Sequence, residues 1–305
     1  FLKNLLVIFN YKKILIKYKK LKLAIFSYDR LASASEIISA KLNNLKTLSF
    51  QTRVKFIYLN FPVNYDFYLT TSYHLKKELL KNKFNFSEVL VCENIKNRSY
   101  KQKNNTNPLK KYFKNENKIC LILDCLSELD WYKDGLEIIN NKKNQIFFLK
   151  RILYLVTNYP NINFIIKKKY LNYYKIQKNY QFERIYKQIY KQNNIIFSNS
   201  IKNSNSDNLL FNSDIIFSQY SSGIDEALNL DKLVIGYNIN QQFNFMNKKV
   251  FFKEIIVNNE NELYKKFKIL NTNKFKKKIS KMKKKYFGQK NQNLEKILNN
   301  LLIKN

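Results

Sequence analysis

The feature that most constrains the fold is an alternation of apolar and polar segments in residues 214–238, DIIFSQYSSGIDEALNLDKLVIGYN. An apolar run begins at Ile215, a polar turn follows it, and about two turns of helix then lead to a second apolar run at Leu233. This order predicts a strand, a helix and a second strand, which together make a βαβ unit. Such units build parallel sheets that bind ligands at the carboxyl ends of their strands.

The helix of this unit has two different sides. Ile224, Ala227 and Leu228 have i, i+3, i+4 spacing, which predicts a buried face. The polar residues share another side: Ser222, Asp225, Glu226 and Asn229. This polar stripe begins at the helix N-terminus, where free N–H groups favour anions. Two interpretations stay open: a phosphate site with Glu226 accepting from a sugar hydroxyl, or a capping box made by Ser222 and Asp225.

Residues 221–235, SSGIDEALNLDKLVI, resemble a signature of GT-B glycosyltransferases, S-S-x-x-x-E-A-hydrophobic-x-x-x-K-P-V-I. The resemblance is nearest to the bacterial branch that builds capsules and other surface polysaccharides. It implies that Ser221, Ser222 and the helix start at Gly223 face the phosphates of a donor, and that Glu226 holds its ribose. Leu233 stands where the family has proline, and nucleotide-sugar epimerases of the same fold carry a similar motif.

A second point of resemblance follows the strand predicted for residues 163–166. Polysaccharide-building relatives have K-P-H-P there, and Lys167 matches the lysine, while the proline and histidine are absent. A lysine at the carboxyl end of a strand can neutralise a donor phosphate. A solvated strand end is the alternative in a chain so rich in lysine.

The amino-terminal part alternates between strand and helix patterns. Residues 5–9, 23–27, 46–51 and 65–71 read as strands, and residues 31–42 and 72–83 read as helices. This alternation resembles the second half of a GT-B acceptor domain, with Gln51-Thr52-Arg53 in place of the family's Q-H-G. The candidate acceptor-side residues are Asp29, Arg30, Gln51 and Arg53. An ordinary Asp–Arg pair is the alternative for the first two.

Domain boundaries follow from composition. Residues 94–117 are rich in lysine and asparagine, have no apolar periodicity, and predict a linker between domains at 1–93 and 118–305. The chain starts at Phe1 with an apolar stretch, so we expect the first domain to be incomplete. In the second domain, residues 274–287 predict a basic helix with a narrow apolar stripe. That stripe fits an anionic membrane surface or packing on its own domain.

The formal net charge of +34 does not by itself indicate a nucleic-acid partner. Only five of the 56 basic residues are arginine, which is the favoured reader of bases and phosphates. The lysines accompany many Asn, Ile, Phe and Tyr residues, all with A/T-rich codons. The three cysteines are scattered and fit a reducing cytoplasm, and the single histidine, His74, cannot build a histidine-rich metal site.

These observations together predict an α/β protein with a GT-B-like fold, in which two Rossmann-like domains have parallel sheets facing a cleft. The resemblance implies a glycosyltransferase that moves sugar from a nucleotide-sugar donor to a surface polysaccharide or glycolipid. We expect no metal or cofactor, and a cytoplasmic location at the inner face of the membrane. No catalytic base is identifiable, and retention and inversion both stay open. The alternatives are a nucleotide-sugar epimerase of this fold and a non-catalytic basic binding protein.

Overall fold

A computed structural model describes most of the chain: residues 2–18, 20–26, 34–50, 65–81, 86–92, 107–113, 115–124, 142–168, 180–202, 204–219, 221, 223–238, 254–270, 272–287 and 293–303. The chain divides into two compact units. Unit 1 comprises Phe1–Asn97 together with Lys281–Asn305, and unit 2 comprises Arg98–Ser280.

Unit 2 contains a six-stranded sheet in which every pairing is parallel. Its strands are β5 (Lys118–Asp124), β6 (Ile162–Lys168), β7 (Ile195–Phe197), β8 (Ile215–Ser218), β9 (Leu233–Tyr237) and β10 (Ile256–Val257). The strands form because their apolar runs are buried on both faces, as in Ile119, Leu121 and Ile122, which are all 0% exposed.

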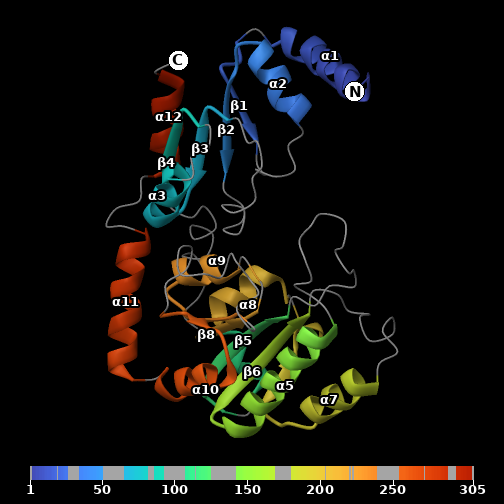
Figure 1. Cartoon of the computed structure of the whole chain (residues 1–305), viewed down its shortest axis with the longest axis vertical. Helices are drawn as coiled ribbons and strands as arrows, with labels where there is room; N and C mark the ends of the chain where they lie inside the picture. Colours follow the sequence, from blue (N-terminus) through green and yellow to red (C-terminus); the bar gives the residue numbers. More distant parts are fainter. Residues whose placement is uncertain are drawn as a thin grey trace. The chain divides into compact units, whose positions relative to one another are not determined.

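The strand order β10-β9-β8-β5-β6-β7 is that of a Rossmann fold. The direction of winding reverses between β5 and β8, and ligands of such sheets bind outside the carboxyl ends at this switch point. The helices of unit 2 are α5 (Lys142–Asn158), α7 (Tyr180–Tyr190), α8 (Ser206–Asn212), α9 (Gly223–Asn229) and α10 (Glu260–Ile269), with short 3-10 turns at Lys110–Tyr112 and Ser198–Ser200. Figure 1 shows α8 and α9 on one side of the sheet and α5 and α7 on the other.

Unit 1 contains a four-stranded parallel sheet in the order β1-β2-β3-β4. The strands are β1 (Leu23–Phe26), β2 (Lys46–Phe50), β3 (Phe67–Thr70) and β4 (Glu88–Val91), and the helices are α1 (Leu2–Ile16), α2 (Ala34–Leu42), α3 (Tyr73–Lys81) and α12 (Leu294–Ile303). Ser72 caps α3, because its Oγ accepts a hydrogen bond from the Leu75 amide at 3.3 Å. Two parallel α/β sheets confirm the predicted fold class.

The strand predicted for residues 5–9 is wrong, since these residues lie within helix α1. The apolar run continues at helical spacing, so that Ile8 and Leu15 lie half-buried on the side that packs against α2. The Tyr11 hydroxyl donates to Glu36 Oε1 of α2 at 2.8 Å. A short apolar run fits a strand or a buried helix equally well, and here contact with α2 decides for the helix.

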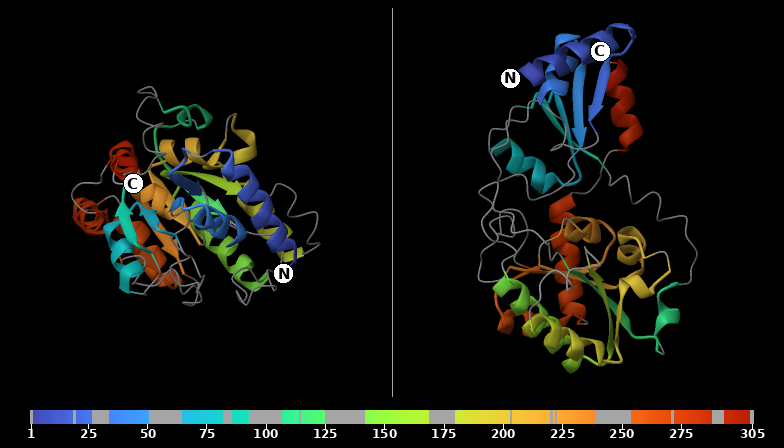
Figure 2. Two further views of the ribbon diagram at one scale, coloured as in Figure 1. Left: turned by 90° about the horizontal axis from the view of Figure 1, so that it is seen from above. Right: turned by 90° about the vertical axis from the view of Figure 1, so that its right-hand side faces the viewer.

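The carboxy-terminal residues also differ from the expected domain division. Lys281–Asn305 belong to unit 1, whereas composition placed the whole of 118–305 in the second domain. The reason is hydrophobic packing: Ile297 and Leu301 of α12 join Leu48, Leu69 and Cys92 in one buried cluster. Figure 2 shows α12 alongside the sheet of unit 1, although it is the last helix in the chain.

The basic helix predicted for residues 274–287 is α11 (Asn273–Phe287), and the boundary between the units falls within it. Its apolar stripe is 0–5% exposed at all four positions: Phe275, Ile279, Met282 and Tyr286. Packing within the protein therefore explains the stripe. Among the described residues, no helix combines the length and hydropathy that a membrane-spanning segment needs.

The described part of the expected linker is packed rather than isolated. Leu109 is 1% exposed, and the Asn107 side-chain amide donates to the Asn212 carbonyl of α8 at 2.7 Å. The Tyr112 hydroxyl accepts from the Lys202 amide at 3.0 Å. Residues 107–117 thus belong structurally to unit 2, while residues 94–106 lie outside the described part of the chain.

Candidate functional site

The carboxyl ends of three neighbouring strands bring distant residues into one row. Leu123 of β5 is in register with Lys167 of β6 on one side and with Ser218 of β8 on the other. Residues in register point to the same face of a sheet, and strands lie about 4.8 Å apart, so Lys167 and Ser218 are about 10 Å apart along the row. This row crosses the switch point of the unit 2 sheet.

Lys167 is half-buried at the end of β6. Its ammonium group donates to the Ser204 carbonyl at 3.2 Å, just before α8. Burial lowers the pKa of Lys167, and the nearby Asp207 carboxylate opposes that shift. An anion that approached this ammonium group would favour its charged form.

The turn after β8 is held by Ser221. Its Oγ accepts from the Gly223 amide at 3.1 Å, and its carbonyl accepts from the Ile224 amide at 3.3 Å. Gly223 starts α9 in close contact with the sheet, since a Cβ added there would lie 2.6 Å from Leu123 Cδ1. A glycine lets the helix approach the strand this closely. Ser221 therefore shapes the turn through its own hydroxyl.

Helix α9 has the buried face that its spacing predicts, because Ile224, Ala227 and Leu228 are all 0% exposed. Glu226 lies half-buried one turn after the start of the helix. Ser222 lies outside the described residues, so the Ser222–Asp225 capping box stays a prediction. The structure thus places Ser221, Gly223 and Glu226 on one turn and helix, with Leu123 between this turn and Lys167.

Two buried polar residues at the same edge were not singled out from the sequence. Gln219 directly follows β8, is 3% exposed, and has a side-chain Nε2 without a hydrogen-bond partner among the described residues. Asn238 directly follows β9, is 4% exposed, and its backbone amide donates to the Val257 carbonyl at 2.7 Å. The signal was available, since each is a polar residue placed directly after an apolar strand run.

The candidate acceptor-side residues lie outside the described part of the chain, and their roles stay predictions: Asp29, Arg30, Gln51 and Arg53. The described residues of both units contain no cluster of three His, Cys, Asp or Glu side chains that could hold a metal ion.

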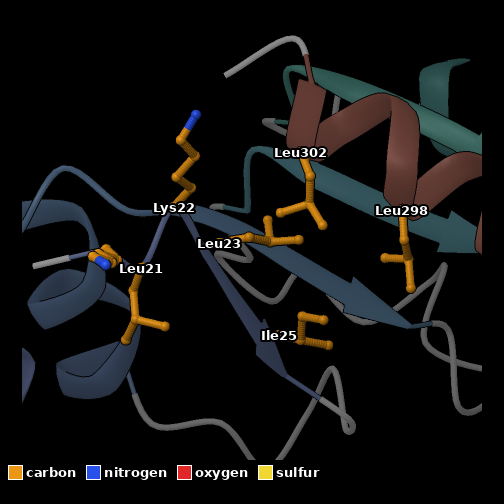
Figure 3. Close-up of a pocket in the computed structure, with 7 residues that line it drawn as sticks. Leu21, Lys22, Leu23, Ile25, Leu298 and Leu302 are labelled. Atoms are coloured by element: carbon orange, nitrogen blue, oxygen red, sulfur yellow. The ribbon is translucent and has the colours of Figure 1, made fainter. Parts of the chain in front are cut away.

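Unit 1 has a groove of about 320 Å³ beside the edge strand β1. Its floor is made by leucine and isoleucine side chains of β1 and α12, and Lys20 and Lys22 are its charged residues. Figure 3 shows Leu298 and Leu302 of α12 reaching towards the β1 side chains. The described residues that line the groove are apolar or positively charged, so they offer apolar contact and positive charge.

No protein-family model matches this sequence, and no curated protein matches it. Solved structures do match its fold. A UDP-GlcNAc 2-epimerase from Neisseria meningitidis, bound to UDP-GlcNAc, superposes with a TM-score of 0.64 at 16% identity, over 99% of this chain and 81% of that one.

Two further solved structures also match the fold. A glycosyltransferase from Rickettsia africae superposes with a TM-score of 0.53 at 18% identity, over 97% of this chain and 79% of that one. Anabaena HepE in complex with UDP superposes with a TM-score of 0.52 at 11% identity, over 96% and 81%. At these identities the likeness establishes architecture. The chain therefore has a GT-B-like fold with two Rossmann-type parallel sheets, an architecture that it has in common with nucleotide-sugar epimerases and with glycosyltransferases.

Proposed function

We propose that this protein is a glycosyltransferase that binds a nucleotide sugar at the carboxyl edge of β5 and β8 and passes the sugar to a glycan or glycolipid. The observation that carries the proposal is the switch-point edge itself. Lys167 lies near the end of β6, and the turn at Ser221 follows β8, as does Gln219, whose side-chain Nε2 has no hydrogen-bond partner among the described residues. The matched structures that hold UDP or UDP-GlcNAc support a uridine nucleotide as the donor's leaving group.

Each residue has a distinct role in this proposal. Lys167 supplies positive charge to the departing diphosphate, and the Ser221 hydroxyl donates to a phosphate oxygen. Glu226 accepts hydrogen bonds from the ribose hydroxyls. Such donors, fixed before the reaction begins, stabilise the charge that develops on the leaving group, so the proposed reaction needs no metal or cofactor. We assign no general base, and the proposal covers both retention and inversion.

An epimerase is the second candidate, because the Neisseria epimerase superposes with a TM-score of 0.64, which is higher than the 0.53 of the Rickettsia glycosyltransferase. The two activities separate by their need for an acceptor. An epimerase converts UDP-GlcNAc without an acceptor, whereas a transferase consumes the donor and releases UDP in proportion to the glycosylated acceptor. Product analysis by mass spectrometry, with and without a membrane extract as the acceptor source, distinguishes them.

The first test is nucleotide binding. We expect UDP to raise the melting temperature in a thermal-shift screen of nucleoside mono- and diphosphates, because a ligand that binds only the folded state stabilises it. Isothermal titration calorimetry then gives the dissociation constant. If no nucleotide shifts the melting temperature and calorimetry detects no heat, the proposed function is wrong.

Glu226→Gln tests the ribose contact. The change keeps the shape of the side chain and removes its charge, so we expect UDP affinity to fall by about 1.5–3 kcal/mol, the range for a hydrogen bond to a charged group. This corresponds to roughly 10–150-fold in dissociation constant. Glu183→Gln is the matched control, because Glu183 lies on α7 and forms an exposed ion pair with Lys187. Equal affinities in the two variants would remove Glu226 from the site.

A further inference from the structure

Helix α1 presents large apolar side chains to solvent, and this feature is independent of the proposed reaction. Leu6, Phe9 and Ile16 are 61%, 58% and 52% exposed. With Lys13 they follow i, i+3, i+7, i+10 spacing and so lie along one side of the helix. The opposite side packs against α2 and is fixed there by the Tyr11–Glu36 hydrogen bond. The outward side is therefore a fixed surface of unit 1.

The charge on this segment has one sign. The first 28 residues contain seven lysines and no aspartate or glutamate. Lys12 and Lys13 of α1 are exposed, and so are Lys17 and Tyr18 directly after the helix, with Tyr18 at 59%. Apolar side chains bordered by lysines, with an aromatic ring at the helix end, are the pattern of helices that lie at a membrane surface.

We propose that α1 docks unit 1 onto a bilayer that contains anionic lipid, with Leu6, Phe9 and Ile16 entering the headgroup region and the lysines contacting lipid phosphates. The helix lies in the plane of the membrane, because its 15 residues are fewer than the about 20 needed for crossing. Charge complementarity favours an anionic bilayer over a second copy of the chain as the partner of this surface. A second copy would bring its own lysine-rich segment against this one, whereas an anionic bilayer neutralises it.

Two other parts of the chain support the choice of α1 as the element that docks on the membrane. The more basic helix α11 has its apolar stripe buried at 0–5% exposure, so it offers charge without apolar contact. By contrast, the segment after α1 continues the combination of apolar and basic groups. There Leu21, Leu23 and Ile25 line the groove of unit 1 together with Lys20 and Lys22 (Figure 3). Apolar and basic groups therefore coincide at α1 and the adjoining edge of β1.

Co-sedimentation with vesicles tests the proposal on the full chain. Vesicles of phosphatidylcholine are compared with vesicles that also contain phosphatidylglycerol. We expect binding to the mixed vesicles that weakens as salt rises, since salt screens the lysine contribution. Leu6→Ser with Phe9→Ser is expected to lower the partition coefficient by on the order of 10-fold through lost apolar burial. Changing Lys12, Lys13 and Lys17 to Gln is expected to lower it by on the order of 100-fold at low salt.

Matched control variants test whether vesicle binding is specific to the α1 surface or arises from any exposed apolar or basic residues. The apolar control is Tyr180→Ser, because Tyr180 is 78% exposed on unit 2. The charge control changes three exposed lysines of α11 to Gln: Lys274, Lys276 and Lys277. Circular dichroism confirms that each variant is folded. Controls that lose as much binding as the α1 variants overturn the proposal.

A reporter variant keeps the test decisive if the serine variant fails to fold. Phe9→Trp preserves an aromatic side chain, and the sequence has one other tryptophan, Trp131. Vesicles with phosphatidylglycerol should shift its emission to the blue, and brominated lipid should quench it, both relative to the parent protein. No shift and no quenching overturn the proposal. A doubled mass by light scattering that disappears in Phe9→Trp or Leu6→Ser would instead assign the surface to self-association and also overturn it.

Discussion

Gln219 buries an amide group at the end of β8, and its Nε2 has no hydrogen-bond partner in the part of the chain that the structure describes. A buried donor left unpaired costs about 1–3 kcal/mol. Such a cost is tolerated where the group meets a partner during function, and the proposed donor supplies phosphate and sugar oxygens that accept hydrogen bonds. This amide is therefore an observation in favour of the proposed site that is independent of the Ser221–Gly223 motif.

Gln219→Met is expected to have opposite effects on stability and on binding. Methionine has a similar volume and no donor, so the unfolding free energy of the ligand-free protein should rise by about 1 kcal/mol. UDP affinity should fall roughly 5-fold or more through loss of one hydrogen bond. Urea unfolding and calorimetry measure the two effects. Lower stability with unchanged affinity would mean that the amide is paired inside the protein and has no ligand role.

The sequence predicted the structural environment of single residues correctly where those residues belong to a pattern of apolar and polar positions. The turn at Ser221 and the buried face of α9 follow from an apolar run, a polar turn and helical spacing, and Gly223 stands at the helix start as expected. Gln219 could not be assigned in the same way, because sequence does not reveal whether a polar residue after a strand is buried. That outcome depends on the elements packed around it.

At the scale of elements, Asp66 ties the starts of β2 and β3 together. Its Oδ2 accepts from both the amide and the hydroxyl of Thr47 at 2.8 Å, and its own amide donates to Thr47 Oγ1 at 2.9 Å. These bonds lie next to the Leu48–Phe67 pair that sets the register of the two strands.

Asp66→Ala should lower the unfolding free energy of unit 1 by about 2–3 kcal/mol, because it leaves the Thr47 amide without its charged acceptor. Glu88→Ala is the matched control, since Glu88 is an exposed carboxylate at the start of β4. Urea unfolding followed by circular dichroism measures both. A loss no larger than that of the control would mean that the strand ladder alone holds the register.

Prediction of elements was strongest for long apolar runs and clear caps. Strands β2 and β3 lie within the predicted ranges 46–51 and 65–71, and helix α3 lies within the predicted range 72–83. The strand β4 and the helix α12 were not predicted, because each is short and its partners are distant in sequence. Helix α1 was assigned to the wrong class because its contact with α2 decides its conformation.

At the scale of the whole molecule, unit 1 is assembled from two separated parts of the chain. Ile297→Ala should lower the unfolding free energy of unit 1 by about 2–4 kcal/mol, since Ile297 is 2% exposed in its core. Leu302→Ala, on the same helix and 46% exposed, should change it by less than about 1 kcal/mol. Hydrogen exchange measured by mass spectrometry reports the two units separately.

In the expected outcome, Ile297→Ala speeds exchange in β2 and β3 and leaves β5 and β8 protected. Faster exchange in both units would mean that they unfold as one cooperative body. Composition alone could not predict this division, because the sequence of an amphipathic helix such as α12 does not show which of the two cores buries its apolar side chains.

The return of α12 to unit 1 has a consequence for synthesis on the ribosome. Strands β1 to β4 leave the exit tunnel before unit 2 does, yet the side chains of Leu48 and Leu69 gain their partners Ile297 and Leu301 only after unit 2 has been translated. Unit 2, which is continuous in sequence, can complete its sheet earlier. Of the two sheets, the sheet of unit 1 therefore emerges earlier and completes its hydrophobic core later, and it stays accessible to chaperones until α12 has been translated.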